Sequence, residues 1–246
     1  MLTILTFAGG LIAGSFLNTC IYRLPRGESI LVPPSYCPQC RHRLHPLDLI
    51  PLVGFLLLKG KCRYCRQPIS RRYPLVELLM GLLTVALYYH REPGTLLSAL
   101  VATGVVIVAA CTDMEHGIIP DGLVLPTLFA GVVYSFFSPL TSPGSSIAGI
   151  FLGGGSLLVI AFLSGGGMGG GDIKLMAALG AWLGCRLLLM VLFFSFLLGG
   201  IGGIWLLLLK IKERRDSVAF APYIAVAVFL TLLGEKFICN YSWLFC

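Results

Sequence analysis

The stretch Gly165–Lys174, GGGMGGGDIK, separates two apolar regions of the chain and ends in a carboxylate, Asp172, and a lysine. Glycine has no side chain to hinder the backbone, so such a run permits an extended segment or a close backbone approach. A carboxylate beside segments of membrane-spanning length is costly and is usually paired or functional. A second carboxylate cluster, Asp113-Met114-Glu115, also interrupts apolar sequence. The pattern predicts that Asp113 and Asp172 meet as a catalytic pair near a membrane face.

The composition favours an integral membrane protein. Of the 246 residues, 57% are hydrophobic and only 12% are charged, and the mean hydropathy is +0.91. Soluble domains usually carry about 25% charged residues. The net charge of +7 could indicate nucleic acid, but membrane proteins concentrate lysine and arginine in their cytoplasmic loops. We therefore expect a lipid bilayer as partner and no nucleic acid.

The apolar segments predict an all-α polytopic membrane protein with about eight transmembrane helices. The segments fall near residues 2–21, 75–90, 95–112, 123–137, 147–164, 173–187, 188–209 and 218–238. The sixth is short, and its boundary with the seventh is open. The expected domains are a first transmembrane helix at 1–21, a cytoplasmic zinc-binding loop domain at 22–73 and a seven-helix membrane domain at 74–246.

The distribution of positive charge tests this topology. With residues 22–73 inside and the sides alternating, all but three of the 18 lysines and arginines lie inside, the exceptions being Arg91, Arg186 and Lys236. The basic run KIKERRD at residues 210–216 is best explained as a solvated segment that sets the topology. The bias supports eight spans with both termini outside, and it places Asp113 and Asp172 on the same side.

Four of the nine cysteines form two CxxC pairs, Cys37-Pro-Gln-Cys40 and Cys62-Arg-Tyr-Cys65, with 21 residues between the pairs. Two such knuckles can supply four thiolates to a tetrahedral, structural zinc ion. The separation lies just outside the usual window of about 15–20 residues, and reduced cysteines or a redox pair remain the alternative. A small polar loop buries little core, so a metal would contribute folding energy.

Carboxylate chemistry suits Asp113 and Asp172, which border apolar segments. Two carboxylates that share a site do not both ionise cheaply. One can act as general base on a water molecule while its protonated partner polarises a peptide carbonyl, without a catalytic metal. The alternative for Asp172 is a helix N-cap, because an aspartate before a helix accepts backbone N–H bonds. Asp121 fits the same alternative for the next apolar segment.

These residues resemble a known family. GGGDIK around Asp172 is similar to the GxGD motif of intramembrane-type aspartyl proteases, and CTDMEHGIIPD around Asp113 is similar to the first aspartate motif of bacterial type IV prepilin peptidases. Further stretches resemble the bifunctional members of that family: GSFLNTCIYRLPRGESI, both CxxC knuckles, LLLKGKCRYC and PISRRYPLVELL. The resemblance covers about residues 7–225.

The resemblance implies a multi-pass enzyme of the bacterial inner membrane with its active site facing the cytoplasm. Such enzymes remove the short basic leader of type IV prepilins and pseudopilins after a glycine, which serves pilus assembly and protein secretion. The new N-terminal residue, usually phenylalanine, is then N-methylated from S-adenosylmethionine. The family's two catalytic aspartates correspond to Asp113 and Asp172.

Methyl transfer is implied by the resemblance alone, because no glycine-rich nucleotide-binding fingerprint follows a strand pattern. Arg23, Gly60, Lys61 and Glu77 lie in matching motifs and are candidates for binding S-adenosylmethionine or the leader. Their alternative role is loop structure and topology. Two other functions remain open: a peptidase without methylation, and a transporter whose membrane carboxylates carry protons or cations.

Overall fold

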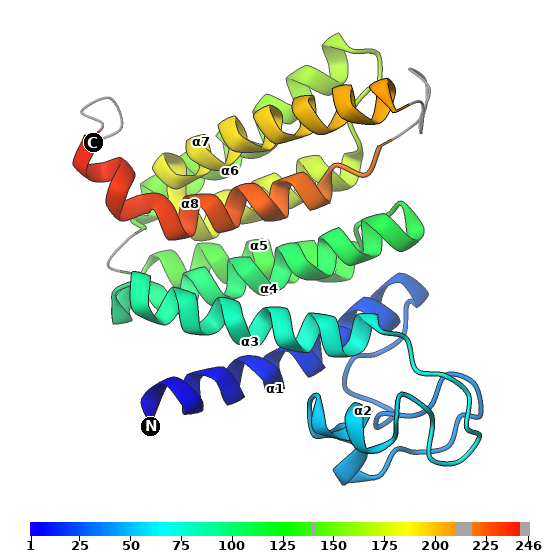
Figure 1. The fold of residues 1–246 in the computed structure, drawn as a ribbon. Helices are drawn as coiled ribbons and strands as arrows, with labels where there is room; N and C mark the ends of the chain where they lie inside the picture. Colours follow the sequence, from blue (N-terminus) through cyan, green and yellow to red (C-terminus); the bar gives the residue numbers. More distant parts are fainter. Residues whose placement is uncertain (139–140, 210–217, 242–246) are drawn as a thin grey trace. The chain divides into compact units, whose positions relative to one another are not determined.

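The computed structural model describes residues 1–138, 141–209 and 218–241, with side chains in the last range described as far as residue 234. Across these residues the structure contains helices and two isolated β-bridges but no strand. Figure 1 shows the α-helices: α1 (Leu2–Arg23), α2 (Val53–Leu57), α3 (Arg72–His90), α4 (Pro93–His116), α5 (Asp121–Ser135), α6 (Pro143–Leu163), α7 (Gly170–Leu208) and α8 (Ala221–Tyr241). The predicted all-α architecture is confirmed.

The length and composition of the helices are those of a multi-pass membrane protein. Among the described residues, five are long and apolar enough to cross a membrane: α3, α4, α6, α7 and the helix that starts the chain, Leu2–Arg26. Two shorter apolar helices, Asp121–Ser135 and Ala221–Gly234, accompany them. The basic run at residues 210–216 lies outside the described residues.

The long helix α7 consists of two halves joined at a sharp break. Gly184 has φ 72° and ψ 175°, which is not helical. A Cβ atom added to Gly153 of α6 would lie 2.5 Å from the Met176 carbonyl oxygen and 2.9 Å from Leu188 Cδ2. Met176 and Leu188 therefore both touch the same residue of α6. In a continuous helix they would be about 18 Å apart, so the chain reverses between them. The sixth and seventh predicted segments are therefore separate, and their boundary lies at Gly184.

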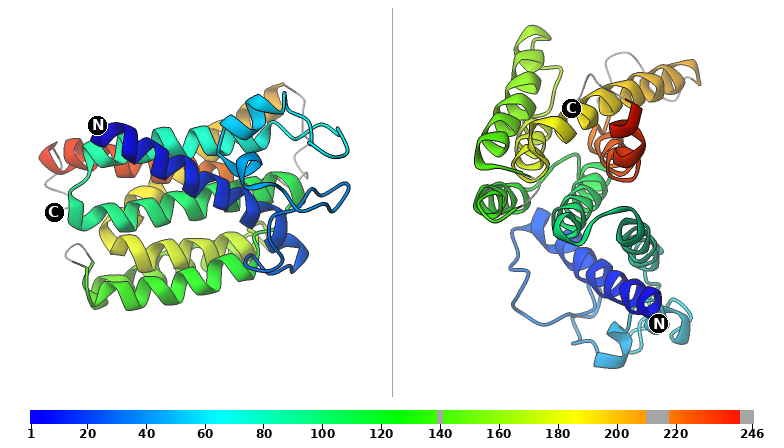
Figure 2. Two further views of the ribbon diagram at one scale, coloured as in Figure 1. Left: turned by 90° about the horizontal axis from the view of Figure 1, so that it is seen from below. Right: turned by 90° about the vertical axis from the view of Figure 1, so that its left-hand side faces the viewer.

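The chain divides into two compact units, residues 1–89 and residues 90 onward. The predicted domains at 1–21, 22–73 and 74–246 stay a prediction. In the first unit α1 and α3 run antiparallel and side by side (Figures 1 and 2). A Cβ on Gly10 would lie 2.8 Å from the Gly81 Cα, and one on Gly14 would lie 2.7 Å from the Glu77 Cα. Small residues thus allow close approach of the two backbones.

In the second unit α6 and the first half of α7 pack backbone against backbone. A Cβ on Gly149 would lie 2.5 Å from the Gly180 carbonyl oxygen, and the Ser146 hydroxyl donates to the Ala181 carbonyl at 2.9 Å. On α7, Trp182 donates its indole N–H to the Thr127 carbonyl of α5 at 2.8 Å. These contacts fix the first half of α7 against α5 and α6, and so fix the end that carries Asp172.

Candidate functional site

Asp172 lies in the first turn of α7 and is nearly buried. The N-cap of this helix is Gly169, and no side chain caps it. The N-cap alternative for Asp172 is therefore wrong, because Asp172 is the third residue of the helix. Its side chain is 9% exposed, and its Oδ1 atom has no hydrogen-bond partner among the described residues. A buried carboxylate oxygen without a partner is costly to keep, which marks this atom as a candidate for binding substrate or water.

Asp113 lies in the last turn of α4, where the helix ends at Gly117 in the left-handed conformation. The carboxylate of Asp113 is half-buried, and its Oδ2 atom accepts a hydrogen bond of 3.1 Å from the backbone N–H of Ala221. Ala221 is the first residue of α8. Three helices therefore meet at the two aspartates: the end of α4 and the starts of α7 and α8.

The structure brings the two aspartates together. The charge of Asp113 acts directly on the carboxyl group of Asp172, although 58 positions separate them in the sequence. One member is almost enclosed and has a free oxygen, and the other is held by a backbone hydrogen bond. Such a pair can divide the work of general acid and general base between two different environments.

The glycines before Asp172 have distinct neighbours. A Cβ on Gly169 would lie 2.8 Å from Asp172 Oδ2, and one on Gly171 would lie 3.0 Å from the Ile119 Cβ. A Cβ on Gly170, between them, would meet nothing within 4 Å. The GxGD pattern thus leaves room for the catalytic candidate at its first glycine and for the Ile119 segment at its second. The sequence pattern singled out this motif, but it did not assign these separate roles.

Asp121 is not part of the pair. It is the first residue of α5, whose N-cap is Pro120 without a side-chain cap, so the N-cap alternative is wrong here too. The Asp121 carboxylate is exposed and accepts bonds of 2.8 and 3.0 Å from the Lys174 Nζ. This ion pair links the start of α5 to the second turn of α7 at the surface.

The four CxxC cysteines form a compact cluster in the first unit. The Sγ atoms of Cys37, Cys40, Cys62 and Cys65 all lie within 4.8 Å of one another, and the Cys37 and Cys65 Sγ atoms are 3.9 Å apart. A tetrahedral zinc ion with Zn–S bonds of about 2.3 Å separates its sulfur ligands by roughly 3.8 Å. The geometry and the chemistry of the four donors therefore fit zinc.

The two knuckles repeat one backbone design. The Arg41 N–H donates to the Cys37 carbonyl at 2.8 Å, and the Arg66 N–H donates to the Cys62 carbonyl at 3.0 Å. Both arginines have positive φ, 55° and 59°. These turns aim the cysteines of each pair at a common point. Burial opposes ionisation of Cys62, but hydrogen bonds from the backbone N–H groups of Cys65 and Tyr64 lower its pKa to about 7.

The candidate methyl-transfer residues have mostly structural contacts. Arg23 is buried and donates to the Ser29 and Pro34 carbonyls at 2.9 and 3.2 Å. Glu77 is buried and accepts the Leu52 N–H at 2.8 Å. Both therefore hold the loop that follows α1.

The other two candidates lie in the second knuckle. Gly60 has φ +70°, and a Cβ there would lie 3.1 Å from the Phe55 ring. Lys61 is exposed and pairs with Pro68 in a β-bridge. The four candidates thus have separate local contacts: Arg23 and Glu77 with the loop after α1, and Gly60 and Lys61 beside the second CxxC pair.

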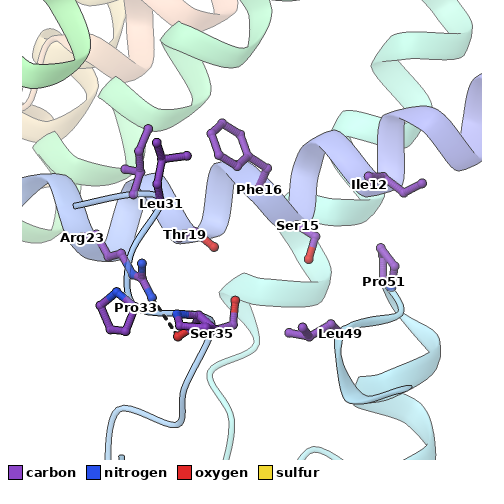
Figure 3. Close-up of a pocket in the computed structure, with 12 residues that line it drawn as sticks. Ile12, Ser15, Phe16, Thr19, Arg23, Leu31, Pro33, Ser35, Leu49 and Pro51 are labelled. Carbon is purple, nitrogen blue, oxygen red and sulfur yellow. Dashed lines mark hydrogen bonds between the residues drawn. The ribbon is translucent and has the colours of Figure 1, made fainter. Parts of the chain in front are cut away.

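A cavity of about 330 Å³ lies beside α1 in the first unit. Figure 3 shows the Ser15 and Thr19 hydroxyls and the Arg23 side chain on its α1 wall. Leu31, Pro33, Ser35, Leu49 and Pro51 lie on the loop side. The cavity was not predicted, because it depends on how the loop after α1 folds back against that helix.

Comparison with known proteins accounts for both parts of the chain. Residues 9–91 match the bacterial peptidase A24 N-terminal domain, and residues 100–204 match the type IV leader peptidase family. A prepilin leader peptidase/N-methyltransferase of Aeromonas hydrophila is 40% identical over 93% of this chain and 89% of its own length. Its namesake in Pseudomonas aeruginosa is 34% identical over 91% and 87%. That of Bacillus subtilis is 39% identical over 98% of each chain.

No solved structure matches the chain. The sequence matches nevertheless cover the aspartates of the second unit and the cysteine cluster of the first. Identity of 34–40% over at least nine-tenths of this chain shows that the protein belongs to the type IV leader peptidase family.

Proposed function

We propose that this protein cleaves the leader from type IV prepilins or pseudopilins and then N-methylates the new N-terminal residue. The observation that carries the peptidase proposal is the meeting of Asp113 and Asp172 at the ends of α4 and α7. Membership of a peptidase family decides against the transporter alternative. The positive charge of the loops supports a cytoplasmic site in a bacterial inner membrane.

In the proposed mechanism the two aspartates share one proton. The ionised member takes a proton from a water molecule, whose oxygen attacks the scissile carbonyl carbon. The protonated member donates a hydrogen bond to the carbonyl oxygen and stabilises the charge that develops there. The aspartate that took the proton from water then gives it to the nitrogen of the leaving amine, and the C–N bond breaks. The N–H of Ala221 suits Asp113 to the base role, and the enclosure of Asp172 suits it to carry the shared proton.

Zinc has a structural role in this proposal. Cys37, Cys40, Cys62 and Cys65 would supply all four ligands, as the spacing of their Sγ atoms supports. A bound ion would then hold the two knuckles together with no open position for substrate. The metal thereby contributes to folding of the loop after α1.

Methyl transfer is assigned to the first unit. S-adenosylmethionine would supply the methyl group: its sulfonium C–S bond would break as the methyl carbon bonds to the nitrogen of the neutral N-terminal amine, which would then lose a proton to solvent. The cavity beside α1 supports this location, since it offers hydroxyl groups and an arginine within an apolar wall, as small-molecule sites commonly do. Arg23 lines it, and Glu77 borders it through Leu52, next to the lining residue Pro51. Gly60 and Lys61 are kept as candidates for contacting the leader.

The test is cleavage of a purified model prepilin, followed by mass spectrometry. Asp113→Asn and Asp172→Asn should each abolish leader removal while the protein keeps its thermal transition. Asp121→Asn, at the exposed ion pair with Lys174, is the matched control and should cleave normally. Normal processing by either folded active-site variant would refute the assignment of the aspartates.

A second measurement separates the two activities. The α-amine exists only after cleavage, so the Asp172→Asn enzyme should leave full-length prepilin unmethylated. It should methylate a pilin that is supplied already cut. If the wild-type enzyme cuts but transfers no methyl group, the protein is a peptidase only. If a folded Asp172→Asn enzyme methylates nothing, the two reactions share one site.

A further inference from the structure

The loop after α1 contains an apolar segment whose exposed face the peptidase and methyl-transfer proposals do not use. Residues 47–58, LDLIPLVGFLLL, contain one charged side chain, Asp48. They include all but the first residue of the 3-10 helix Pro46–Leu49, and the short helix α2. Most of their large side chains are exposed, and Leu56 and Leu57 are 70% and 74% exposed. An exposed patch of this kind marks an interaction site.

The exposed leucines lie on one side of α2 because the other side is packed. Phe55 lies against Gly60 of the second knuckle, and the Gly54 N–H donates to the Ile50 carbonyl at 2.8 Å. Val53 lies three and four residues before Leu56 and Leu57, so it shares their face, and it is also exposed. The short helix therefore presents a continuous apolar face with no described residue over it.

A hydrogen bond pins this segment beside the membrane-spanning part of α3. The Leu52 N–H donates to Glu77 Oε2 at 2.8 Å, and Leu52 has φ 59°, which is uncommon for leucine. Glu77 lies five residues after the start of α3, which is about 7–8 Å along the helix axis. Helices that lie in a membrane interface bury their apolar face about 5–10 Å into the boundary between headgroups and acyl chains. The segment is thus anchored at a depth that suits this boundary.

The charges around the segment suit a phospholipid surface. Its own carboxylate, Asp48, is bonded to the Arg63 guanidinium through contacts of 2.5–3.0 Å. The Arg63 hydrogen bonds hold the pKa of Asp48 below its usual value. The other exposed cations close in sequence to the segment are Arg41, Arg43, Lys59 and Lys61. Basic residues beside an exposed apolar face attract anionic headgroups.

We propose that residues 47–58 insert into the bilayer, with the apolar face of α2 among the acyl chains and the flanking cations at the headgroups. The apolar surface of α2 then continues the lipid-facing surface of α3, where Leu75, Leu78 and Leu79 are exposed. Glu77 is the positioning residue that holds the inserted segment. The cavity beside α1, which includes Leu49 and Pro51, then opens at the membrane surface.

The experiment is photo-crosslinking of the full-length protein in vesicles of phosphatidylethanolamine and phosphatidylglycerol. Leu57 is replaced by p-benzoylphenylalanine, and the irradiated protein is digested and weighed by mass spectrometry. We expect a phospholipid adduct on the peptide that contains residue 57. Leu56, also exposed, provides a second position if the first variant does not fold. Gln67, exposed on the second knuckle, is the matched control and should give no lipid adduct.

Each outcome decides for or against insertion. Lipid adducts at residues 56 and 57 but not at 67 would support it. Adducts at 56 or 57 to a peptide from residues 90–246 would show that the rest of the chain covers the face. Adducts to a second copy would show a dimer interface instead, and folded variants with no adduct would show a face in water. Any of these three results overturns the proposal, and none depends on cleavage or methylation.

Discussion

Replacing Gly169 by alanine should damage the active site through a single methyl group. The new Cβ would lie 2.8 Å from Asp172 Oδ2, whereas ordinary contacts begin at 3.4 Å. The carboxylate must therefore move by about 0.6 Å. Misplacement of a reacting group by about 1 Å can cost roughly 100-fold in rate, so a shift of this size should lower the rate of leader cleavage by about tenfold.

The assay is single-turnover cleavage of a model prepilin, with the thermal transition of each variant recorded in parallel. Gly170→Ala is the matched control, because its Cβ meets nothing within 4 Å. Gly170 is also the first helical residue, where alanine should raise the free energy of unfolding by about 0.5–1 kcal/mol. This variant should cleave at the wild-type rate.

Gly169→Ser separates a displaced carboxylate from a weakened helix start. Gly169 is the N-cap of α7, where alanine is less favourable than glycine and serine is among the best residues. Serine should therefore restore the stability that alanine loses, yet it carries the same Cβ and should stay slow. Recovery of cleavage in the serine variant would show that capping, and not the position of Asp172, limits the alanine variant. Wild-type activity in both would refute the geometric reasoning.

Three further predictions concern features away from Asp172. Elemental analysis of the purified protein should find about one zinc ion per chain. The Cys37→Ser variant should lose the zinc, whereas the control Cys185→Ser, outside the cluster, should keep it. Gly184→Ala should lower the free energy of unfolding by about 1–3 kcal/mol, because only glycine tolerates the dihedral angles at this position. An unchanged thermal transition would contradict this. Gly155→Ala is the control, because its Cβ would meet nothing within 4 Å. Asp121→Asn should cost at most about 1 kcal/mol, as expected for the loss of an exposed ion pair, and a larger loss in denaturant unfolding would argue for a buried role.

Much of the fold could be predicted because hydrophobic length is a strong signal in a membrane. The apolar segments near 95–112 and 147–164 correspond to α4 and α6. The boundary between the sixth and seventh segments could not be placed from hydropathy, because the sequence on both sides of Gly184 is apolar apart from Arg186. Its position depends on a turn against Ser145, whose hydroxyl accepts the Cys185 N–H at 3.2 Å. Such a contact has no signature in composition.

The residues of the candidate site could be proposed from the sequence, but their contacts could not. The two aspartates and the four cysteines could be chosen because each pattern has a chemical reason. The sequence identified two CxxC knuckles, but only the structure shows that Cys37 and Cys62 begin equivalent backbone turns, each closed by the N–H of Arg41 or Arg66. The roles of Arg23 and Glu77 could not be separated from loop structure, because their partners are backbone groups.

The break at Gly184 also determines how Asp113 is held. If α7 were one straight helix, Leu208 would lie about 54 Å from Asp172. The chain from Leu208 to Ala221 could cover at most about 45 Å even if fully extended, and unpaired backbone does not cross lipid. Ala221 could then not donate to Asp113, which lies beside Asp172. The observed hydrogen bond from Ala221 to Asp113 therefore requires the reversal at Gly184. Gly184, although remote from the aspartates, thus allows the start of α8 to reach Asp113 and donate a hydrogen bond to it.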